Sequence, residues 1–294
     1  MRFNLVTLAL CSIFATSPQD DDSRYLDPWN SPTISLNGAY FGYASSNNRH
    51  PVMQLSELPA IPGLRYRTCF EMCPVDTCYA SRAIFALRCP DEPALLQWAS
   101  SRGEWFIKCC ETDEYDVEVE TSGKTKSFST YRQILDYYAE EISRQFRKPC
   151  ANTGPDPNRQ IALLITDCWS TDKYTTFYEA SWYDHCSNGN TFREAYSSVD
   201  RDTGEVAILD DFVEPSQQDK LSEVMMDYLR DSNGDLWRSS PERWQIPPMD
   251  VLHSMDGCAL IKEGLVIFYL PYTIASGVEG EIKAVIPYDV IREL

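Results

Sequence analysis

Residues 231–242, DSNGDLWRSSPE, combine residue types and a spacing that suit a calcium ion. The oxygen-bearing side chains at positions 1, 3, 5 and 12 of such a loop are Asp231, Asn233, Asp235 and Glu242. The pattern departs from a calcium loop at position 6, where Leu236 replaces the glycine that makes the sharp turn. A helix end followed by an ordinary loop explains the same residues. We therefore predict no metal site and keep this loop as a calcium candidate.

The sequence contains no familiar catalytic motif. Its three histidines, His50, His185 and His253, form no HExxH pair, and there is no GxSxG, Walker or dinucleotide-binding motif. His185 lies between Asp184 and Cys186, but adjacent residues of a strand point to opposite faces, which disfavours a base beside a nucleophile. We predict no catalytic residue and no cofactor. A glycosidase-like pair of carboxylates remains an alternative that the sequence does not locate.

The N-terminal stretch MRFNLVTLALCSIFATSPQDDD has the layout of a secretory signal peptide. Arg2 precedes a short apolar stretch from Leu5 to Ala15, and polar and acidic residues follow. This stretch is too short to span a bilayer, and no other approaches the ~20 apolar residues that a transmembrane helix needs. We expect a mature protein without a transmembrane segment that is secreted or held in the periplasm or cell envelope. A lipid anchor at Cys11 is the alternative.

The cysteine count fits export. The chain has 11 cysteines, and removing Cys11 with the signal peptide leaves ten. An even number in an exported chain is typical of disulfides, whose connectivity the sequence does not give. The disulfide candidates are Cys69, Cys73, Cys78, Cys89, Cys109, Cys110, Cys150, Cys168, Cys186 and Cys258. The spacing in CFEMCPVDTC does not favour zinc.

The chain is strongly acidic, with 26 basic against 44 acidic residues and a net charge of -18. Such a charge repels phosphate backbones and anionic membrane surfaces, so we predict no nucleic-acid partner. A cationic partner suits it better, although solubility alone also explains an acidic surface. With 43% hydrophobic residues, the chain has enough apolar material for a sizeable core.

Two helices and several strands are predicted from periodicity. Apolar residues fall on one face of 130–148, where Thr130 and Gln133 can form a capping box, and a second helix is expected from residue 216 to about 232. Strands are predicted at 115–120, at 161–169 and on both sides of a turn at 202–204, and then at 265–270 and 282–286. Runs of strands with two long helices favour an α+β fold, with an antiparallel or mixed sheet packed by two main helices and containing disulfides.

The predicted organisation has four parts. Residues 1–17 form the signal peptide, and residues 18–60, rich in Ser, Asn, Asp and Pro, form an extended N-terminal segment. Residues 61–184 form an N-terminal partner region, and residues 185–294 form a C-terminal domain.

A series of motifs in the last 110 or so residues resembles a known family. The matching residues are Asn188, Gly189, Asn190, Asp200, Thr203, Gly204, Leu209, Asp210, Asp211, Phe212, Gly264, Leu265, Phe268, Tyr269, Pro271, Tyr272, Ile274, Ala275, Gly280, Ile286, Pro287 and Tyr288. In order and spacing they resemble the C-terminal domain of RsiV-type anti-sigma factors. This bacterial cell-envelope domain of unknown function is also found in PdaC-type peptidoglycan deacetylases. The chain departs from the pattern in the loop at 185–189 and at Thr273, where the family has Glu.

The resemblance implies an exported binding or sensing module without catalytic activity. In the anti-sigma factors this domain is similar to a lysozyme receptor, which implies a cationic protein such as lysozyme, or peptidoglycan fragments, as the partner. The loops at 185–190 and 273–280 are the expected binding surface. The candidate binding residues are His185, Asn188, Gly189, Tyr272 and Thr273. A carbohydrate-active cell-wall hydrolase that uses carboxylates and a structural envelope protein are the two alternatives.

Overall fold

The computed structural model describes residues 64–72, 80–112, 126–146, 160–185, 189–232, 248–270, 273–274 and 282–294. The expected signal peptide, the lipid-anchor candidate Cys11, the extended segment 18–60 and the strand predicted at 115–120 lie outside these ranges. Within them, no helix is both long and apolar enough to cross a membrane.

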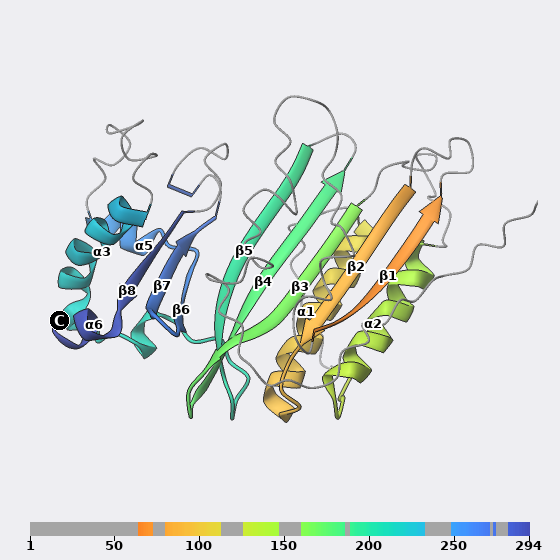
Figure 1. Cartoon of the computed structure of the whole chain (residues 1–294), viewed down its shortest axis with the longest axis horizontal. Coiled ribbons are helices and arrows are strands. Elements are labelled where there is room, and N and C mark those ends of the chain that lie inside the picture. The colour runs from red at the N-terminus through yellow and green to blue at the C-terminus, as the bar shows by residue number, and fades with distance from the viewer. Residues whose placement is uncertain are drawn as a thin grey trace, which may run out of the picture.

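A five-stranded sheet forms the larger part of the fold (Figure 1). Its strands, in spatial order, are β1 (Arg65–Met72), β2 (Ala80–Arg88), β3 (Gln160–Ser170), β4 (Tyr174–His185) and β5 (Gly189–Asp200). β2 and β3 are parallel, and the other neighbours are antiparallel. The apolar run predicted at 161–169 is the central strand β3, whose residues 161–168 are all buried, as expected for a strand covered on both faces.

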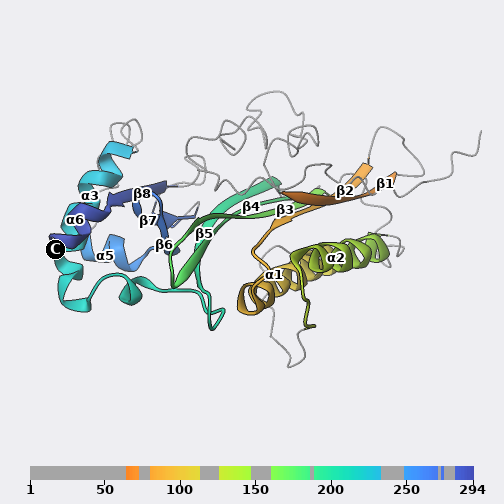
Figure 2. The same ribbon diagram turned by 60° about the horizontal axis from the view of Figure 1, so that its bottom comes forward.

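Two long helices cover one face of this sheet (Figure 2). They are α1 (Pro93–Thr112) and α2 (Tyr131–Phe146). One half of the predicted capping box of α2 is present, since the Gln133 backbone N–H donates to Thr130 Oγ1 at 3.4 Å. The other half is shifted by one residue: Gln133 Oε1 accepts the N–H of Ser129 at 2.8 Å instead of that of Thr130. The two helices approach closely at Gly103, where a Cβ would overlap the Tyr138 ring.

A second, three-stranded antiparallel sheet follows in the C-terminal part. It consists of β6 (Gly257–Ile261), β7 (Gly264–Tyr269) and β8 (Ile282–Pro287). The strands predicted at 265–270 and 282–286 match β7 and β8 to within one residue. The helices of this part are η2 (Leu209–Asp211), η3 (Pro215–Gln217), α3 (Gln218–Ser232), α5 (Pro248–His253) and α6 (Tyr288–Arg292). A core cluster joins α3 and α5 to one face of the small sheet.

The two sheets pack on each other through a separate apolar cluster. It joins residues of the large sheet, such as Tyr178 and Tyr196, to Ala259, Val266 and Phe268 of the small sheet. Helices α1 and α2 therefore lie on the far face of the large sheet, and α3 and α5 on the far face of the small one (Figure 2). The prediction of an α+β fold with antiparallel and mixed sheets is confirmed.

The prediction that the fold contains disulfides is not supported. Five of the candidate cysteines have described side chains, all are buried, and none forms a disulfide: Cys89, Cys109, Cys110, Cys168 and Cys258. They are divided among three separate core clusters, where a thiol packs as a small apolar group. Cys109 and Cys110 are also neighbours on one helix. Cys69 lies in β1, and Cys73, Cys78, Cys150 and Cys186 lie outside the described residues.

Candidate functional site

The structure joins only part of the predicted binding surface. His185 ends β4 and pairs with Gly189 at the start of β5, so the two residues lie opposite each other in the sheet. Asn188 and Tyr272 lie outside the described residues. Thr273 is exposed, and its hydroxyl donates to Asp256 Oδ2 at 2.6 Å. These candidates stay predictions.

The calcium candidate is likewise only partly described. Asp231 lies in the last turn of α3, whereas Asn233, Asp235 and Glu242 lie outside the described residues. Among the residues that the structure does describe, no three His, Cys, Asp or Glu side chains gather as metal ligands do.

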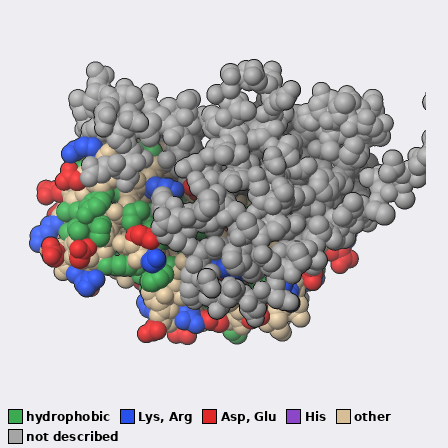
Figure 3. All heavy atoms as spheres, in the orientation of Figure 1, with side chains coloured by type: hydrophobic (Ala, Val, Ile, Leu, Met, Phe, Trp, Pro, Cys, Tyr) green, Lys and Arg blue, Asp and Glu red, His purple; other side chains and the backbone are tan. Residues whose placement is uncertain are grey.

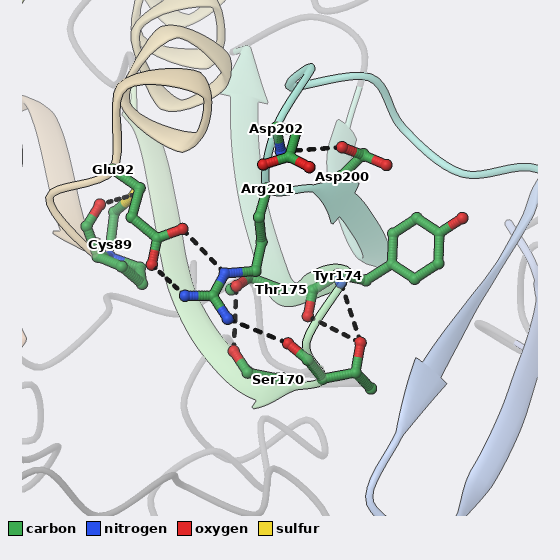
Figure 4. A network of polar contacts seen from close by, with 10 residues as sticks. Cys89, Glu92, Ser170, Tyr174, Thr175, Asp200, Arg201 and Asp202 are labelled. Carbon is green, nitrogen blue, oxygen red and sulfur yellow. Dashed lines mark hydrogen bonds and ion pairs between the residues drawn. The ribbon is translucent and has the colours of Figure 1, made fainter.

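A polar network around Arg201 anchors the start of the connection between the two sheets (Figure 4). We call residues 201–214 the connection segment; it leads from β5 along the edge of the molecule towards α3 (Figure 2). The Arg201 guanidinium donates to both carboxylate oxygens of Glu92, at 2.9 and 2.5 Å, and to the carbonyl of Thr171 at 3.2 Å. Such a two-bonded pair fixes direction as well as distance. It ties the start of the segment to the residue that precedes α1.

A tight turn follows, as the sequence predicts. The Asp200 carboxylate accepts the backbone N–H groups of Asp202 at 2.9 Å and Thr203 at 3.0 Å, which lowers its pKa. Gly204 has a φ of 77°, in the left-handed region that glycine adopts most easily. A Cβ there would lie 2.8 Å from the carbonyl oxygen of Ala94 in α1. The turn therefore needs glycine both for its conformation and for its packing.

The Asp-Asp-Phe motif secures the far end of the segment. Asp211 Oδ2 accepts the Ile208 N–H at 2.9 Å, and Asp210 Oδ1 accepts the Gln218 side-chain amide at 2.7 Å. The Phe212 ring meets the Tyr174 ring edge-to-face at 5.6 Å. These contacts hold η2 between the large sheet and α3, so the motif has a structural role.

Part of this region matches a known family model. Residues 210–289 match DUF3298, a protein of unknown function. The DUF3298 match begins at the Asp-Asp-Phe motif and runs through α3, α5 and the small sheet to the start of α6. The resemblance drawn from the sequence is thus supported at the level of a DUF3298 domain.

Two solved structures of DUF3298 family proteins are similar to this chain. One, from Pseudomonas aeruginosa PAO1, has 14% sequence identity and a TM-score of 0.45, covering 78% of this chain and 92% of that one. The other, from Bacteroides fragilis NCTC 9343, has 12% identity and a TM-score of 0.44, covering 79% and 93%. A comparison with curated proteins finds no match.

The connection segment, which overlaps the start of the DUF3298 match, exposes apolar and acidic side chains together. Val206 is 48% exposed and Ile208 is 63% exposed, while the residues between and after them, Ala207 and Leu209, are buried. The acidic residues Asp202, Glu205, Asp210, Asp211 and Glu214 are all exposed. Its one basic residue, Arg201, is paired with Glu92 outside the segment, and the formal charge of the segment is -5 + 1 = -4. Figure 3 shows hydrophobic, acidic and basic side chains together on the described surface at the C-terminal end of the molecule.

The more deeply buried ion pairs have structural roles. Arg88 pairs with Asp167, and burial raises the pKa of Asp167 although the Arg88 charge opposes the rise. Arg102 of α1 pairs with Glu179 of β4 and stacks over Trp105. The first pair joins strands β2 and β3, and the second joins α1 to β4. Both carboxylates are largely covered. The carboxylates of the connection segment, by contrast, are exposed and within reach of another molecule.

Sequence reasoning identified the turn and the Asp-Asp-Phe motif but not the exposed face. Alternation of apolar and polar residues indicates a strand, yet it does not say which face of the strand a neighbouring element covers. In this segment Ala207 and Leu209 face the core, whereas Val206 and Ile208 face outward. The signal available in the sequence was the mixture of acids and β-branched residues in GEVAILDD.

Proposed function

We propose that this protein is a non-catalytic binding module that takes up a cationic protein partner at the connection segment. The observation that carries the proposal is the exposure of Val206 and Ile208 within a segment of charge -4. Exposed large apolar residues rimmed by polar ones are typical of interaction surfaces. Carboxylates around them select a basic partner and speed its approach.

The rigidity of the segment supports the same proposal. The Arg201–Glu92 pair, the Asp200 turn and the Asp211 cap fix its backbone before any partner arrives. A preformed surface loses little conformational freedom on binding, so more of the contact free energy contributes to affinity. Loops held by a rigid scaffold commonly carry binding function.

The family resemblance supplies the more specific form of the proposal. An exported module of the RsiV type would bind lysozyme, a strongly basic protein, or a cell-wall fragment. The net charge of -18 suits the first of these partners through long-range attraction. We therefore propose lysozyme as the first partner to test and the bacterial cell envelope as the place of action.

Titration calorimetry with hen lysozyme tests the proposal, carried out across a salt series. We expect saturable binding that weakens as salt rises, and a loss of on the order of tenfold in affinity for the double variant Asp202→Lys/Glu205→Lys. The matched control is Glu140→Lys/Asp250→Lys, which makes the same charge change on α2 and α5, away from the segment. Equal losses for both double variants would mean that only net charge matters. Absence of saturable binding to wild type would refute the proposal for lysozyme.

A further inference from the structure

The backbone of the connection segment contains a short open strand edge. Val206 forms an isolated antiparallel bridge with Val199 of β5. The hydrogen bonds of this bridge flank it: the Asp200 N–H donates to the Glu205 carbonyl at 2.9 Å, and the Ala207 N–H donates to the Ser198 carbonyl at 2.8 Å. In this pairing the N–H and C=O of Val206 itself point away from β5.

Those two groups have no hydrogen-bond partner among the described residues, in contrast to their neighbours. The Ile208 N–H is occupied by Asp211 Oδ2, and the Ile208 carbonyl accepts the Asp211 N–H at 3.0 Å. The Glu205 N–H donates to Thr203 Oγ1 at 3.2 Å. The open edge is therefore one residue long and is closed at both ends, which is a common way to limit edge pairing.

The side chains around this edge follow strand geometry. Val206 and Ile208 are two residues apart and both exposed, and the intervening Ala207 is buried. Residues i and i+2 of a strand share one face. A strand added along this edge would thus place alternate side chains against Val206 and Ile208.

We infer that an extended, basic and apolar segment of a partner protein adds to this edge as a strand, exchanging both backbone hydrogen bonds with Val206. The inference rests on the proposed binding function and specifies how the partner is recognised. Strand addition takes affinity from main-chain hydrogen bonds and specificity from alternate side chains. The carboxylates of Glu205 and Asp210 border the apolar pair and select basic residues on the added strand.

Charge also decides between a foreign partner and a second copy of this chain. Pairing of two copies through this edge would bring together two segments of charge -4 on molecules of net charge -18. Like charges brought face to face oppose association, whereas a basic strand is attracted. We therefore assign the edge to a basic partner.

The test uses the blocked peptide KVKVKVK and a version with N-methyl groups on the valines, each titrated into the whole protein. Two variants separate backbone from side chain: Val206→Pro removes the outward N–H, and Val206→Ala keeps it. Since Val206 donates no hydrogen bond to the described residues, Val206→Pro removes none of the bonds within that part of the chain. Ala207→Pro, by contrast, removes the bond to Ser198 and is expected to destabilise the fold.

We expect Val206→Pro and peptide N-methylation each to weaken peptide binding about tenfold, and Val206→Ala about threefold. In the wild type, saturation with KVKVKVK should slow hydrogen exchange of the Val206 amide. That exchange measurement and the N-methylated peptide serve as tests even if Val206→Pro fails to fold.

The inference is overturned if Val206 exchange is unchanged at saturation, if N-methylation has no effect, or if the protein self-associates through this edge instead. Lysozyme binding that is lost in Asp202→Lys/Glu205→Lys but retained in Val206→Pro would overturn strand addition alone and leave the proposed function standing. Absence of saturable lysozyme binding by the wild type would instead refute the proposed function for lysozyme.

Discussion

Replacing Gly204 with alanine is a direct test of how the turn positions the connection segment. The φ of 77° costs an alanine about 1–2 kcal/mol, because its Cβ crowds the following carbonyl. The added Cβ also lies 2.8 Å from the Ala94 carbonyl oxygen, a backbone atom that moves only if the first turn of α1 moves. We assign this shift about 1 kcal/mol. The lower entropy of the unfolded alanine variant offsets about 0.7 kcal/mol.

The expected net loss is therefore about 2 kcal/mol of unfolding free energy. Urea unfolding followed by circular dichroism measures it, and an unchanged dependence on urea would show that the loss belongs to the native state. Thr203→Ala is the neighbouring control. It removes an exposed hydroxyl that accepts the Glu205 N–H at 3.2 Å and also hydrogen-bonds the Asp200 carboxylate. Because these bonds are exposed, we expect a loss below about 1 kcal/mol.

A second substitution separates the two causes. Asparagine tolerates positive φ better than alanine, but its Cβ meets the same Ala94 carbonyl. Gly204→Asn should therefore recover only part of the loss. The reasoning would be refuted if Gly204→Ala unfolded within about 0.5 kcal/mol of the wild type, or if Gly204→Asn recovered full stability.

Two further predictions concern ionisable groups. Burial raises the pKa of the Cys258 thiol to about 12, so we expect iodoacetamide at pH 8 to label it only after denaturation, without added reductant, as mass spectrometry would record. The Asp200 carboxylate has a lowered pKa because the N–H groups of Thr203 and Asp202 favour its charged form. Its contribution to stability should be present above pH about 3.8 and be lost as the pH falls through the lowered value, which unfolding measured across acidic pH will show.

Each of these has a matched control. A requirement for reductant before any of the five buried cysteines reacts would contradict the thiol prediction. For the turn, Asp200→Asn keeps an oxygen acceptor but does not titrate, so its stability should vary less with pH in this window. Parallel pH profiles for this variant and the wild type would contradict the assignment.

Local patterns allowed much of the fold to be predicted. The apolar run of β3, the one-sided helix α2 and the turn at Gly204 all depend on residues that are close in the chain. Helix α1 was missed because its apolar and aromatic residues spread over about half of its circumference, with Trp105 and Ile107 on nearly opposite sides. A helix with apolar residues on several sides gives no clear stripe.

The rest depended on contacts between distant segments. Whether Val206 is covered is decided by the path of the chain after β5, which no local period reports. The disulfide expectation came from the inferred compartment and cysteine number, but the five described thiols form no disulfide: Cys168 and Cys258 each lie in a separate core cluster, and Cys89, Cys109 and Cys110 share a third. Pairing of cysteines is a property of the folded geometry.

A ring of hydrogen bonds connects the two sheets at one point. The Leu260 N–H donates to Ser198 Oγ at 2.9 Å, Thr176 Oγ1 donates to the Leu260 carbonyl at 2.5 Å, and the two hydroxyl oxygens are 2.7 Å apart. The Thr176 proton is donated to the Leu260 carbonyl, so Ser198 must donate to Thr176 Oγ1. In the closed ring each hydroxyl donates one hydrogen bond and accepts one.

The apolar surfaces around this ring attract each other without preference for direction. On their own they would allow the small sheet to slide or rotate by a residue at little cost. The ring can close in only one such alignment, and any slip would leave the buried hydroxyls of Thr176 and Ser198, together with the half-buried peptide groups of Leu260, without these partners. Two small side chains, each with one hydroxyl, thus fix the alignment of the two sheets that the much larger apolar contact makes stable.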